Sequence, residues 1–107
     1  MIYTLQQIHD IVAPVAKKYH IPAVYIFGSY ARGTATEDSD IDILVDTSGV
    51  GLRGMAWGGL YNDFEEAFEK SVDLVTLDTF NQKPRGQSQL HFRENVMRER
   101  KQVFAAD

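Results

Sequence analysis

The sequence of 107 residues contains no cysteine. Neither a disulfide framework nor a thiolate metal site can therefore form. No apolar run approaches the length of a membrane span, and the N-terminal residues lack the basic start and apolar stretch of a signal peptide. These absences predict a protein without membrane contact that is located in the cytoplasm.

Basic residues are also scarce, because 11 Lys and Arg stand against 15 Asp and Glu for a net charge of −4. Diffuse binding to a polyanion needs a basic surface, so long nucleic acid is not an expected direct partner. The acidic residues cluster instead between Glu37 and Asp46. Such a cluster is either a solvated turn or a cation site.

The length fits one compact domain over residues 1–107, with enough apolar material for one core. Apolar periodicity predicts helices over residues 5–19, 57–68 and 88–104, strands over 23–27, 41–45 and 72–77, and a short helical turn over 29–33. The predicted order is αβ(α)βαβα, an α/β (α+β) fold with a three-stranded mixed sheet and flanking helices.

The connections between these strands predict where polar residues meet. The short link from the first strand to the second suits antiparallel neighbours, and the helix between the second and third suits a parallel crossover. Gly28 and Ser29 then lie at the end of the first strand, Asp40 and Asp42 at the start of the second, and Asp73 at the start of the third. All three groups should meet at one edge of the sheet.

The Asp40-Ile41-Asp42 segment places two carboxylates on one face of the second strand, because alternate side chains point the same way. Two such carboxylates repel each other unless a cation lies between them. Oxygen ligands favour Mg²⁺ or Mn²⁺, and Mg²⁺ lets substrate phosphates complete its coordination shell. The alternative for so short a motif is an exposed acidic turn.

The Gly28-Ser29 pair follows a buried strand and is a candidate phosphate site. Glycine lets the backbone approach a ligand closely, Ser29 supplies a hydroxyl that can cap the next helical turn, and Arg32 can add positive charge toward a triphosphate. Read alone, this is an ordinary junction between a strand and a turn. Its spacing to the Asp-x-Asp motif gives it weight.

The segment GSYARGTATEDSDIDILV, from Gly28 to Val45, resembles the nucleotidyltransferase superfamily of DNA polymerase β. The similarity to its smallest members, the MNT-domain antitoxins that accompany HEPN-domain ribonuclease toxins, is close. The resemblance implies that Asp40 and Asp42 bridge two Mg²⁺ ions, with Mn²⁺ possible, and that Asp73 ligates the catalytic ion and helps deprotonate the acceptor. Asp78 is a competing candidate, but its place at the far end of the third strand predicts a turn residue.

The resemblance further implies a nucleotidyltransferase enzyme that moves AMP from ATP onto a tyrosine hydroxyl of a HEPN toxin, presented from outside this small domain. The alternative is a non-catalytic antitoxin that neutralises its partner by binding alone. Transfer to a small molecule is a further alternative. Trp57 and Tyr61 are candidates for a nucleobase shelf, although core packing is the favoured interpretation of both. The nucleobase, the acceptor and the oligomeric state stay open at this point.

Overall fold

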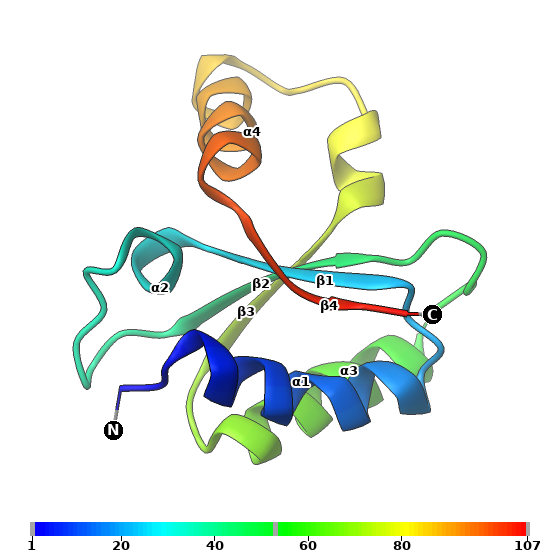
Figure 1. Cartoon of the computed structure of the whole chain (residues 1–107). Helices are drawn as coiled ribbons and strands as arrows, with labels where there is room; N and C mark the ends of the chain where they lie inside the picture. The colour runs from blue at the N-terminus through cyan, green and yellow to red at the C-terminus, as the bar shows by residue number, and fades with distance from the viewer. Residues whose placement is uncertain (1, 53, 107) are drawn as a thin grey trace.

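The computed structural model describes residues 2–52 and 54–106. The elements follow one another as α1 (Leu5–Lys18), β1 (Ala23–Phe27), α2 (Gly28–Arg32), β2 (Ile41–Asp46), α3 (Met55–Phe68), β3 (Val72–Thr76), the 3₁₀ helix η1 (Leu77–Asn81), α4 (Gln87–Glu99) and β4 (Lys101–Ala105) (Figure 1). The mixed α/β architecture with flanking helices confirms the predicted fold class.

The strands form one mixed sheet in the order β3-β2-β1-β4. Strand β1 runs antiparallel to β2, and β2 runs parallel to β3, as the connection lengths predict. The predicted sheet was one strand short, because β4 pairs antiparallel with the other edge of β1. The mixed sheet therefore has four strands.

The final helix of the prediction was wrong at its C-terminal end. Helix α4 stops at Glu99, and Arg100 takes extended backbone angles, with φ −58° and ψ 145°. Val103 and Phe104, which fit a helical spacing in sequence, are buried in β4 instead. A β-branched and an aromatic residue suit a strand, and pairing satisfies the backbone groups at the open edge of β1.

Helices α1 and α3 cover one face of the sheet (Figure 1). Thr4 and Gln7 form a capping box at the start of α1, which satisfies two backbone N–H groups there. The core on this face takes its fully buried side chains from both helices and from alternate positions of the strands. They include Ile8, Val12, Ile26, Ile41, Ile43, Leu60, Phe64 and Phe68.

The opposite face carries α4 and η1, which project away from the sheet (Figure 1). Its buried cluster among the described residues consists of Phe27, Leu44 and Val96, with neighbours that are only partly buried. Much of this face therefore stays open, and the polar side chains of β2 and β3 lie on it. In the described part of the chain, no helix has the length and apolar character needed to cross a membrane.

Candidate active site

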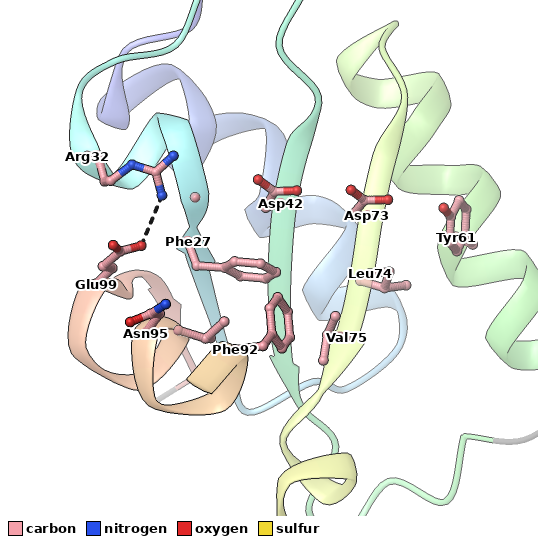
Figure 2. Close-up of a pocket in the computed structure, with 12 residues that line it drawn as sticks. Phe27, Arg32, Asp42, Tyr61, Asp73, Leu74, Val75, Phe92, Asn95 and Glu99 are labelled. Atoms are coloured by element: carbon pink, nitrogen blue, oxygen red, sulfur yellow. Dashed lines mark hydrogen bonds and ion pairs between the residues drawn. The ribbon is translucent and has the colours of Figure 1, made fainter. Parts of the chain in front are cut away.

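Asp42 and Asp73 lie side by side on neighbouring strands. They are register partners in the parallel pairing of β2 with β3. Figure 2 shows both carboxylates on the same face of the sheet, pointing toward one another. The predicted convergence of the second and third strands at one sheet edge is confirmed, and we call these two side chains the carboxylate pair.

The pKa of Asp42 is raised from 3.8 to about 6. Burial is the largest cause, because it disfavours the charged form, and the hydrogen bond with Asp73 and the negative charges of Asp73 and Asp40 add to it. The Arg32 guanidinium opposes the rise. Two carboxylates held this close are electrostatically unfavourable in the absence of a cation.

Asp40 lies just outside β2 and is exposed. It is two residues before Asp42, so its charge reaches the pair and raises the Asp42 pKa. Asp78, the competing candidate, lies in η1 at the other end of β3, where its carboxylate accepts a hydrogen bond from the Thr47 hydroxyl at 3.3 Å. Its position fits the predicted turn residue.

The position of the Asp42 carboxylate requires a glycine at position 28. Its φ of +69° is rarely adopted by residues with side chains, and a Cβ built there would lie 2.1 Å from Asp42 Oδ2. The glycine therefore leaves room for the carboxylate at the end of β1. This contact ties the Gly-Ser turn and the Asp-x-Asp motif together, as their spacing predicts.

Ser29 and Arg32 lie in the short helix α2. Ser29 does not cap this helix, contrary to one prediction, because Phe27 occupies the N-cap position and no side chain forms a capping hydrogen bond. Arg32 lies at the pocket described below, where its Nη1 donates to Glu99 Oε2 at 3.1 Å. Figure 2 shows this ion pair beside Asp42.

An open pocket of about 530 Å³ adjoins the carboxylate pair. Residues from β1, α2, β2, α3, β3 and α4 line it, namely Phe27, Gly28, Arg32, Asp42, Tyr61, Asp73, Leu74, Val75, Phe92, Asn95, Val96 and Glu99. This volume is typical of a small-molecule site. The contributions of α4 were not predicted, since no motif in its sequence marks them.

The two aromatic candidates of α3 differ in position. Tyr61 lines the pocket, and its hydroxyl donates to the Val72 carbonyl. Burial raises the pKa of Tyr61, and the charges of nearby carboxylates, Asp73 among them, add to the rise. Trp57 packs against the main core on the far face of the sheet, so its position fits the packing interpretation.

The pair suits a divalent cation by its chemistry, since both ligands are carboxylate oxygens and burial penalises the charge of Asp42. Within residues 2–52 and 54–106, no set of three His, Cys, Asp or Glu side chains is arranged to hold a metal ion by itself. Mg²⁺ commonly uses one or two carboxylates and takes its remaining ligands from water and phosphate. The carboxylate pair fits that pattern.

Comparison with known proteins gives the family. Residues 9–107 match the family model described as Polymerase beta, Nucleotidyltransferase. A protein of Methanocaldococcus jannaschii named "Putative protein adenylyltransferase MJ0126" is 37% identical over 83 residues, which cover 73% of this chain and 83% of that protein.

Two solved structures share the fold. One, described as a "putative minimal nucleotidyltransferase", is 30% identical, with a TM-score of 0.62 over 92% of this chain and 95% of that one. The other contains a tri-AMPylated HEPN toxin of Shewanella oneidensis in complex with its MNT antitoxin, at 23% identity and a TM-score of 0.60, covering 94% and 73%. The chain described here belongs to the polymerase β nucleotidyltransferase family.

Proposed function

We propose that this protein is an antitoxin that transfers AMP from ATP to a tyrosine hydroxyl of a partner HEPN ribonuclease in the cytoplasm. The observation that carries the proposal is the carboxylate pair beside Gly28, in a chain of the nucleotidyltransferase family. The name of the M. jannaschii relative and the AMPylated HEPN complex of similar fold support the choice of AMP and of the partner.

Asp40, Asp42 and Asp73 would hold two Mg²⁺ ions, or Mn²⁺ in their place. When bound, the ions would lower the pKa of the acceptor hydroxyl and neutralise the charge of the triphosphate and of the leaving pyrophosphate. The crowding of Asp42 and Asp73 supports this assignment, because a cation relieves their repulsion. Asp40 joins the set through its place on the same motif.

Gly28, Ser29 and Arg32 would bind the phosphates. Gly28 brings the backbone close to the carboxylate pair, and Arg32 already lies at the pocket with its guanidinium paired to Glu99. Ser29 would offer its backbone N–H and hydroxyl from the first turn of α2. The Arg32 guanidinium and the backbone N–H groups would already be in position before the reaction. They would therefore stabilise the charge that develops on the phosphates during transfer.

The transfer itself makes one bond and breaks one. The tyrosine oxygen would bond to the α-phosphorus, and the bond from that phosphorus to the bridging oxygen would break as pyrophosphate leaves with the electron pair. The hydroxyl proton would pass to the Asp73 carboxylate. AMP on the partner adds bulk and negative charge beside a ribonuclease site, which would repel its RNA substrate.

The test is to incubate the protein with ATP, Mg²⁺ and its cognate HEPN partner, and to record intact mass spectra of the partner. We expect mass steps of one AMP, which disappear in the Asp40→Asn, Asp42→Asn double variant. An unmodified partner under conditions where the complex forms would contradict the proposal. Full neutralisation of the partner by the double variant at native levels would favour inhibition by binding alone.

A further inference from the structure

The pocket beside the carboxylate pair has two chemically different halves. One half carries the carboxylates themselves and the Arg32 guanidinium. The other half is lined by the apolar side chains of Phe27, Val75 and Phe92, and the uncharged amide of Asn95 lies beside Glu99, where this half meets the charged one (Figure 2). A nucleoside triphosphate is divided in the same way, into charged phosphates and a flat base with polar edges.

The sheet makes the two halves continuous. Val75 follows Asp73 by two residues on β3, so both side chains point to the same face. Phe27 is the register partner of Asp42 in the pairing of β1 with β2. The apolar half therefore begins directly beside the carboxylates, where a nucleoside attached to the phosphates would lie.

Phe92 is an exposed aromatic side chain that is nevertheless held in place. It makes edge-to-face contacts with Phe27, at 6.0 Å between ring centroids, and with Phe80, at 6.4 Å. Even so, 46% of its surface remains exposed. A ring that is fixed by its neighbours and open to the pocket is suited to stacking a nucleobase, because little freedom is lost on binding.

Asn95 lies one turn further along α4, at three residues from Phe92. Its Oδ1 accepts a hydrogen bond from Arg98 Nη2 at 2.5 Å, and a guanidinium can only donate, so the orientation of the amide is determined. Its Nδ2 has no hydrogen-bond partner among the residues that the structure describes. Figure 2 shows this nitrogen on the side facing Phe27, where it can donate to a ligand.

We propose that Phe92 and Asn95 form the nucleobase subsite of this nucleotidyltransferase, an inference that rests on the function proposed above. The base stacks on the Phe92 ring, and Asn95 Nδ2 donates to an acceptor nitrogen of the base. The triphosphate then lies against the carboxylate pair and Arg32. Neither α4 residue touches the reacting atoms, so both determine affinity for the nucleotide rather than chemistry.

Two ligands distinguish the contribution of the base to binding from that of the phosphates. They are ATP and inorganic triphosphate, each with Mg²⁺. Calorimetric titrations would compare the wild type with Phe92→Leu and Asn95→Ala. Met97→Ala is the matched control, because Met97 is a similarly exposed apolar residue of α4 (43%) that lines a different groove. Leucine keeps most of the bulk that Phe27 and Phe80 pack against but removes the aromatic face.

We expect Phe92→Leu to bind ATP about tenfold more weakly, with Asn95→Ala roughly fivefold weaker, because stacking and a hydrogen bond contribute on this scale. Affinity for inorganic triphosphate should be unchanged in both, and Met97→Ala should match the wild type for both ligands. Unchanged ATP affinity in both variants would overturn the inference. So would an equal loss for both ligands, which would indicate damage to the phosphate site.

The inference and the proposed function can fail separately. If the wild type binds ATP and the variants bind it equally well but transfer AMP to the partner more slowly, the ring contacts the acceptor and the nucleobase subsite is wrong. If the wild type binds neither ligand, the proposed function itself fails, and the subsite with it.

Discussion

The face of the sheet covered by α1 and α3 and the face beneath α4 differ in how completely they are filled. The first carries a cluster of 17 buried residues, whereas the second has three, Phe27, Leu44 and Val96, in the described part of the chain. The second face also holds the carboxylate pair and the open pocket. Strand β2 contributes to both, since Ile41, Ile43 and Val45 point to one side and Asp42 and Leu44 to the other.

The difference indicates that the filled face provides the stability of the fold, whereas the open face carries the candidate active site. Crowded carboxylates and exposed aromatic side chains reduce the stability of a fold, and they are characteristic of functional sites. The filled core on the opposite face offsets that cost. Substitutions on the α1 and α3 face should therefore change the free energy of unfolding, and substitutions beside the pair should change nucleotide transfer.

The largest expected effect is on the filled face. Phe64→Ala should lower the free energy of unfolding by about 3–5 kcal/mol, because it leaves a cavity around a fully buried ring. Phe92→Ala, on the open face, should lower it by only about 1 kcal/mol, since nearly half of that ring is exposed. Urea unfolding measures both, and equal losses would contradict the proposed division between the faces.

The next largest effect concerns the close contact between Gly28 and Asp42 of the carboxylate pair. Gly28→Ala should lower the rate of AMP transfer about 100-fold, because its Cβ displaces Asp42 by roughly an ångström. Gly33→Ala is the control, since Gly33 has a similar φ of +77° but no atom near the added Cβ. Transfer rates measured on folded protein compare them. Equal rates in the two variants would show that Asp42 needs no such fixed position.

A smaller effect follows from the pKa of Asp42. Its value of about 6 in the fold lies above the ordinary 3.8, so the folded protein binds the proton more tightly than the unfolded chain does. The contribution of Asp42 to the free energy of unfolding is therefore fully present below pH 3.8, and it is lost as the pH rises through about 6. We expect a loss of roughly 1–2 kcal/mol, reduced by solvent because the group is half-buried.

Unfolding measured with a chelator present, between pH 3.8 and about 6, would test this linkage. The wild type should lose stability relative to Asp42→Asn as the pH rises, because asparagine has no proton to release. Added Mg²⁺ should restore part of the loss at the upper end of the range. A constant difference between the two proteins across the range would contradict the assignment of the shift to Asp42.

The smallest effect lies in α3, away from the site. Gly58→Ala should raise the free energy of unfolding by about 0.5–1 kcal/mol, because alanine favours a helix and no atom lies within 4 Å of the added Cβ. Gly59→Ala should gain less, since its Cβ would lie 2.8 Å from the Tyr19 hydroxyl. Thermal unfolding distinguishes the two, and neither should alter AMP transfer. A larger gain for Gly59→Ala would contradict the packing of α1 on α3.

Much of the site could be predicted because its determinants are local. Strand β1 begins and ends as predicted, since a β-rich run is bounded by Pro22 and Gly28. Because side chains alternate along a strand, Asp40 and Asp42 were predicted on one face of β2 and Ile41 on the other. The helical crossover predicted that β3 runs parallel to β2. Side chains that begin adjacent parallel strands must meet, so the pairing of Asp42 with Asp73 followed from the order of elements.

The parts that could not be predicted depend on contacts between distant segments. Lys101–Ala105 is too short to be distinguished from the end of a helix, and it becomes a strand because the edge of β1 is available to it. Phe92 and Asn95 carry no motif, and they reach the pocket only because α4 stands over the open face (Figure 2). Positions of this kind are decided by packing and not by local pattern.

The central claim is that the Asp42 and Asp73 carboxylates perform the transfer. The most direct test compares Asp73→Asn with Asp78→Asn. Asp73 lies at the start of β3, and Asp78 lies just after its other end, in η1. With ATP, Mg²⁺ and the HEPN partner, mass spectra of the partner should show no AMP with Asp73→Asn and the wild-type product with Asp78→Asn. Wild-type transfer by Asp73→Asn would contradict the account.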